Sequence, residues 1–108
     1  MTAFVNQLRA RREPLRLAAE GVPAITVRVE MAETWDTVQV IASPSEPVLA
    51  VKVRALAALA PAADFHEEFV LKLKGWEVFD EERTTLAAAG AVDGSVFLVQ
   101  HRNRRPVR

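Results

Sequence analysis

The sequence contains no cysteine, only four glycines and no charge-free apolar run long enough to cross a membrane. Without cysteine there is no disulfide framework, thiolate metal cluster or thiol nucleophile. The chain also lacks the glycine-rich patterns that cradle phosphates, namely G-x-G-x-x-G and the Walker motif. A membrane-spanning helix needs roughly 18 to 20 apolar residues, and the N-terminus has no apolar signal-peptide core. We therefore expect a cytoplasmic protein that does not insert into membranes.

The composition is that of one compact globular domain. The chain has 108 residues, of which 50% are hydrophobic and 26% are charged. A length near 100 residues is typical of a single domain with its own core. The arginine and alanine bias, eleven Arg against three Lys, suits a GC-rich bacterial genome.

The net charge is zero, but the charges are unevenly distributed. Residues 1–20 carry a net +2, residues 21–101 carry six basic and twelve acidic side chains, and residues 102–108 carry four arginines. The basic ends could contact an anionic partner or could simply keep the protein soluble. Because the body is acidic and aromatics are few, we do not expect specific nucleic-acid recognition, although a basic tail can neutralise phosphates.

Two periodicities predict an α+β fold. Alternating apolar residues predict strands over 25–31, 38–42, 69–73, 76–79 and 96–101. Apolar residues at three- and four-residue steps predict a helix from Val48 to Pro61, with Ser45 as its N-cap. A hairpin followed by one helix can bury that helix only against the sheet. We therefore predict a β-grasp arrangement with a mixed four- to five-stranded sheet packed on one helix.

The ends lie outside this pattern. Residues 1–22 are predicted to form a helical extension of two short turns, with Pro14 near the start of the second. The β-grasp domain is placed at 23–102, and residues 103–108 form a basic C-terminal tail.

The second half of the chain carries a recognisable motif. Gly75 is followed by a short strand, Thr85-Leu86, three alanines, Gly90, Asp93-Gly94 and an apolar strand at 96–99. Leu86 would anchor a short helical turn, Gly90 would end it with a positive φ, and Asp93-Gly94 would turn into the last strand. This order resembles ubiquitin-like domains, and with the opening hairpin the resemblance covers about residues 25–102.

The resemblance implies a docking module rather than an enzyme or a modifier. Conjugated members of this superfamily end in Gly-Gly, whereas this strand runs into residues 101–108 and the last glycine is Gly94. Among relatives without that tail, the chain is most similar to bacterial YukD-type proteins, which accompany type VII secretion machinery. The similarity rests on Trp76, Val78, Phe79 and the turn from Gly90 to Gly94. The alternatives are an accessory subunit of a diiron monooxygenase, or a modifier or carrier recognised by an E1-like enzyme.

The resemblance also indicates a partner surface on the sheet. Lys72 matches the central isoleucine of the patch by which ubiquitin is read, and we expect Phe97 and Val99 to face outward beside it. An N-terminal segment with Phe4, Leu8 and Leu15 could instead cover this face. The candidate partner-binding residues are Lys72, Trp76, Phe97, Val99, Arg102, Arg104 and Arg105.

No residue pattern indicates catalysis or a cofactor. The only histidines, His66 and His101, would need a third ligand such as Asp64, Glu67 or Glu68 to hold a metal. Serines, histidines and aspartates are present, but no nucleophile-elbow sequence links them. We expect no metal, no cofactor and no enzymatic activity.

Overall fold

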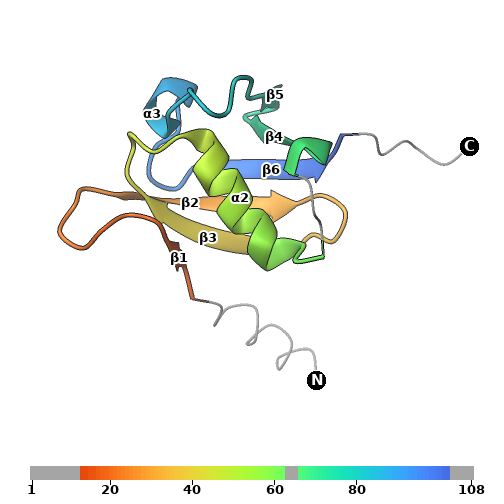
Figure 1. The fold of residues 1–108 in the computed structure, drawn as a ribbon, viewed down its shortest axis with the longest axis horizontal. Helices are drawn as coiled ribbons and strands as arrows, with labels where there is room; N and C mark the ends of the chain where they lie inside the picture. The colour runs from red at the N-terminus through yellow and green to blue at the C-terminus, as the bar shows by residue number, and fades with distance from the viewer. Residues whose placement is uncertain (1–12, 63–65, 103–108) are drawn as a thin grey trace, which may run out of the picture.

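The computed structural model describes residues 13–62 and 66–102, which form a mixed sheet covered on one face by a helix (Figure 1). Within these residues the sheet has six strands in the order β1-β3-β2-β6-β4-β5. The elements along the chain are β1 (Leu15–Arg16), β2 (Ile25–Met31), β3 (Thr37–Ala42), α2 (Val48–Leu59), the 3₁₀ helix η1 (His66–Glu68), β4 (Phe69–Leu73), β5 (Trp76–Glu77), α3 (Leu86–Ala89) and β6 (Val96–His101).

The centre of the sheet joins the two ends of the domain. Strands β2 and β3 form the predicted antiparallel hairpin, and β2 pairs in parallel with β6. Strand β4 then runs antiparallel to β6 on its other side. The packing of one long helix on a mixed sheet is therefore confirmed for the described residues. The predicted strands are also present, except that β5 ends at Glu77 instead of at Phe79.

Helix α2 packs its apolar face on the sheet. Val48, Val51 and Ala55 are fully buried, and they share one core with Val27 and Val40 of the hairpin. Full burial of one such valine contributes about 1.5 to 3 kcal/mol. The helix spans Val48–Leu59, close to the predicted range.

The predicted N-cap of α2 is wrong. Ser45 does not cap the helix, because the capping position is Pro47, which has no side chain able to accept a hydrogen bond. The Ser45 hydroxyl instead lies 2.9 Å from the Ser43 hydroxyl within the turn. The first amide groups of the helix must therefore find acceptors elsewhere.

Those acceptors come from a loop about 35 residues away in the chain. The amides of Val48 and Leu49 donate to the carbonyls of Thr84 and Glu81, at 2.8 and 3.0 Å. In return, the amide of Leu86 at the start of α3 donates to the carbonyl of Glu46 at 2.9 Å. The two helix starts are thus held together by backbone hydrogen bonds instead of by a local cap.

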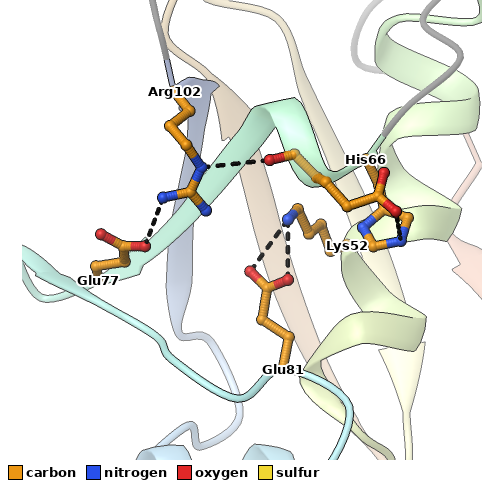
Figure 2. Close-up of polar contacts among 6 residues, drawn as sticks. Lys52, His66, Glu77, Glu81 and Arg102 are labelled. Atoms are coloured by element: carbon orange, nitrogen blue, oxygen red, sulfur yellow. Dashed lines mark hydrogen bonds and ion pairs between the residues drawn. The ribbon is translucent and has the colours of Figure 1, made fainter.

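A buried ion pair joins the same two segments (Figure 2). Lys52 lies on α2 with its side chain 1% exposed, and its Nζ donates to both carboxylate oxygens of Glu81 at 2.9 and 3.1 Å. The Glu81 side chain is 16% exposed. Since an ammonium removed from water is costly unless it is paired, this contact fixes the loop against the helix.

The turn motif near the C-terminal strand is as predicted. Thr85 caps α3 by accepting from the amide of Ala88, and Gly90 ends that helix with φ 92°. Gly94 also has a positive φ, of 90°. The Asp93 carboxylate accepts from the amide of Thr26 at 2.8 Å, which ties the turn to the start of β2.

The predicted helical turn after Pro14 is wrong. Leu15 and Arg16 form strand β1, which pairs in parallel with Val40 and Ile41 and adds a sixth strand to the four or five predicted. Proline lacks an amide hydrogen and is tolerated at a sheet edge, while Leu15 gains packing against the core. The first predicted turn falls in residues 1–12, outside the described residues. The domain boundary at residue 23 stays a prediction.

No helix in the described part of the chain is long and apolar enough to traverse a bilayer.

Removing the Glu81 carboxylate should destabilise the domain. We expect Glu81→Ala to lower the free energy of unfolding by roughly 3 kcal/mol, because it leaves the Lys52 ammonium buried without a counter-charge. Urea unfolding followed by circular dichroism measures the change. The matched control is Glu82→Ala, an exposed neighbour that should change stability by no more than about 0.5 kcal/mol. Equal unfolding midpoints for the two variants would show that the ion pair contributes nothing.

Candidate functional site

The expectation that Phe97 and Val99 face outward is wrong. Both side chains are fully buried. In the parallel pairing of β2 with β6, Phe97 lies opposite Val29 and Val99 opposite Met31, so all four lie on the face that α2 covers. The alternation predicted along 96–101 is confirmed, but its two faces are exchanged. Both faces of this strand are apolar, and only the register with β2 decides between them.

The other residues of the β6 alternation, Val96 and Leu98, lie on the open face of the sheet, which α2 does not cover. Leu98 lies between Glu30 of β2 and Lys72 of β4, and Val96 precedes it with 41% of its surface exposed. Lys72 is half-buried and lies opposite Glu77 on β5. Charged and apolar side chains therefore alternate here, and Leu98 lies beside Lys72 where Phe97 and Val99 were expected.

Arg102 is engaged within the domain (Figure 2). Its amide donates to the carbonyl of Glu68, and its Nε donates to the carbonyl of Glu67 at 3.3 Å. Its Nη1 lies 3.3 Å from the Glu77 carboxylate. The partner-binding role of Arg102 stays a prediction, and any partner would compete with these contacts. Arg104 and Arg105 lie outside the described residues.

Two exposed aromatic side chains flank a pocket beside β5. Trp76 is 79% exposed and Phe79 is 72% exposed. Trp76 pairs with Leu73, a core residue, so it lies on the face of the sheet that α2 covers, at the edge strand β5. The pocket between them has a volume of about 260 Å³. We call it the aromatic pocket; its lining residues are Leu73, Lys74, Trp76, Glu77, Val78, Phe79, Thr84 and Ala89.

The backbone around the aromatic pocket is closely constrained. Lys74 and Gly75 both have positive φ, 56° and 86°, which is the geometry of a tight hairpin turn between β4 and β5. The Thr84 hydroxyl donates to the carbonyl of Phe79 at 3.0 Å. The amide of Val78 donates to the carbonyl of Leu71 at 2.8 Å. The exposed aromatics are thus presented by ordered backbone.

The polar side chains that line the aromatic pocket differ in whether they are already bonded within the domain. The Glu77 carboxylate is paired with Arg102, and the Thr84 hydroxyl donates to the backbone carbonyl of Phe79. Lys74 is exposed and pairs with no carboxylate among residues 13–62 and 66–102. Its ammonium is therefore the group at the rim that remains available to a bound molecule.

A second tryptophan, which the sequence pattern did not single out, is also exposed. Trp35 lies in the turn between β2 and β3, is 73% exposed and has φ 58°. Trp35 comes after Met31, the last residue of β2, which pairs with Val99 near the end of β6. Trp76 comes after Leu73, the last residue of β4, which pairs with Phe97 near the start of β6. The two tryptophans therefore belong to opposite ends of the sheet. The sequence did contain a signal for its exposure, namely a tryptophan within the predicted turn, next to Asp36.

The histidines lie apart from this pocket. His66 Nε2 is 3.6 Å from Glu67, and His101 Nε2 is 3.5 Å from Glu68. The His101 ring also packs edge-on against Phe69, with 5.2 Å between ring centroids. Nowhere in the described residues do three or more His, Asp or Glu side chains gather as a metal site requires. The expectation that no metal binds stays a prediction.

Comparison with solved structures identifies the fold. The ubiquitin-like domain of an Arabidopsis thaliana protein superposes with a TM-score of 0.63 at 18% identity, over 90% of this chain and 97% of that one. Caldiarchaeum subterraneum ubiquitin gives 0.62 at 19% identity, over 78% and 100%. The C-terminal ubiquitin-like domain of a human oligoadenylate synthetase-like protein gives 0.63 at 13% identity, over 84% and 98%.

These likenesses confirm the ubiquitin-like fold that the motif at residues 69–102 predicted. No protein-family model and no curated protein matches the chain.

Adjacent residues of β6 test the corrected face assignment. We expect Phe97→Ala to lower the free energy of unfolding by about 3 to 5 kcal/mol, as for other buried phenylalanines. Leu98→Ala, on the open face and half-buried, should lower it by less than about 1.5 kcal/mol. Urea unfolding of both variants measures the difference. A larger loss at Leu98 than at Phe97 would contradict the assignment.

Proposed function

We propose that this chain is a ubiquitin-like protein-interaction module that acts by docking, without catalysis, and that the aromatic pocket is its contact surface. The observation that carries the proposal is the exposure of Trp76 and Phe79, which line one pocket together with the core residue Leu73.

The energetics favour an interface at this position. Exposed apolar surface gains about 25 cal/mol for each Å² that a partner removes from water. Tryptophan is among the residues that most often dominate binding energy when they fill or flank a pocket. A single exposed aromatic is common on protein surfaces, but two around a pocket form a patch of the kind that marks binding sites.

The rigidity of the pocket supports the same proposal. Phe79 is held by the Thr84 hydroxyl, and the following turn is fixed to α2 by Lys52 and Glu81. A surface that is ordered before binding loses less conformational freedom when the partner arrives. The backbone that carries the two aromatics therefore loses little conformational freedom on docking.

The finer assignments extend this proposal on the strength of the sequence resemblance. We place the module in the bacterial cytoplasm, as a non-conjugated accessory of a larger assembly, with a link to type VII secretion as in YukD-type proteins. Recognition by an E1-like enzyme and service in a diiron monooxygenase remain the alternatives. The resemblance at Trp76, Val78 and Phe79 favours the first assignment, because two of these residues are the exposed aromatics of the pocket.

Substitution of both aromatics should abolish partner capture. We expect immobilised full-length protein to retain a defined set of proteins from a lysate of its own host, and Trp76→Ser with Phe79→Ser to lose them. Quantitative mass spectrometry of the eluates measures the loss. Both side chains are exposed, so the fold should survive, which circular dichroism checks.

The matched control is Trp35→Asn, which removes an equally exposed tryptophan at the other end of the sheet. Asn tolerates the positive φ at this position. This variant should retain the same proteins as the wild type. Retention of the full set by the double variant, or the same losses in both, would refute the proposed surface.

A further inference from the structure

We infer that the aromatic pocket binds an acidic peptide segment of a partner protein, one large apolar side chain of which fills the pocket while a neighbouring carboxylate pairs with Lys74. This inference rests on the proposed function and adds the chemistry of the partner.

The size of the pocket indicates a single side chain. Sites for drug-sized molecules and cofactors usually have volumes of roughly 300 to 1,000 Å³. The aromatic pocket has about 260 Å³ and is open at its rim. Its apolar lining, formed by Leu73, Val78 and Ala89 together with the two aromatics, suits one phenylalanine or leucine side chain. A protruding residue of a peptide segment therefore fits better than a whole small molecule.

The charge at the rim indicates an acidic neighbour for that anchor. Of the two charged residues that line the pocket, Glu77 is already paired with Arg102, which leaves the Lys74 ammonium. A carboxylate next to the anchor residue gains a pair with Lys74, whereas a lysine or arginine there meets the like charge of Lys74. Electrostatic complementarity therefore selects acidic segments over basic ones.

Asp80 sets the direction of the bound segment. It follows Phe79, is exposed and does not line the pocket. Its carboxylate disfavours acidic residues on the Phe79 side, so the segment should place its acidic residues toward Lys74 and Trp76. The acidic residues of the segment therefore lie at the Lys74 end of the contact.

A second copy of this chain is the competing occupant of the pocket, so self-association is tested directly. Trp76 fluorescence that depends on protein concentration alone, abolished by Phe79→Ser, would reveal self-association through the pocket and overturn the inference.

The experiment uses Trp76 as its own reporter. The chain has two tryptophans, so the full-length Trp35→Phe variant emits from Trp76 alone. Its fluorescence is titrated with three acetylated, amidated ten-residue peptides: one with a central phenylalanine among glutamates and serines, one with lysines in place of the glutamates, and one with alanine in place of the phenylalanine. We expect a blue shift with the first and binding at least about tenfold weaker for each of the others.

Two lysine variants isolate the charge contribution. Lys74→Glu should weaken binding of the acidic phenylalanine peptide about tenfold and improve binding of the lysine peptide. Lys72→Glu makes the same charge change on the open face, outside the pocket lining, and should have a much smaller effect. Lys74→Met, which adds no negative charge, gives an intermediate loss and serves if Lys74→Glu does not fold.

The outcomes separate this inference from the proposed function. Equal binding of the acidic and lysine peptides, equal effects of Lys74→Glu and Lys72→Glu, or no binding of the acidic peptide overturns the inference about chemistry. If lysate capture still depends on Trp76 and Phe79 in that case, the docking function stands. Loss of that dependence refutes the proposed function itself.

Discussion

The fold depends on the way Glu81 holds helix α2. Its carboxylate neutralises the buried Lys52 ammonium, and its carbonyl accepts from the Leu49 amide at the helix start. One loop residue thus satisfies a buried charge and an unpaired backbone donor, both costly to leave alone. Because the same loop continues to Thr84, which holds Phe79, this constraint also sets the wall of the aromatic pocket. Stability and the binding surface share one set of contacts.

Much of the fold could be predicted because its signals are local. The alternation over 25–31, the helical spacing from Val48, and the turn residues Gly90 and Asp93-Gly94 each report on neighbours in the chain. The cap of α2 was not predictable in this way, since its acceptors lie on Glu81 and Thr84, far along the chain. The Ser45 side chain could cap a helix, but the capping position of α2 is Pro47. Strand β1 was missed because two residues are too few to show a period.

The candidate site was predictable only in part. Trp76 was identified from its resemblance to known relatives, but the pocket exists only because β4, the turn near Phe79 and helix α3 pack together. Phe97 was assigned to the wrong face because its strand is apolar on both sides, and a parallel partner supplies the missing information. Lys72 lies on the open face as expected, yet beside Leu98 instead of Phe97 and Val99. Register, not composition, decides such surfaces.

The parallel contact between the first long strand and the last has a consequence for biosynthesis. The Thr26 amide cannot donate to the Asp93 carboxylate until Asp93 has been synthesised, and the two residues are 67 positions apart in the chain. While the ribosome is still making the intervening segment, β2 and β3 are a lone hairpin, which is marginally stable in water. The domain therefore closes late, after β6 has left the exit tunnel, and its long-range topology slows that closure. A nascent chain stalled before Val96 would present unpaired strand edges to chaperones and proteases.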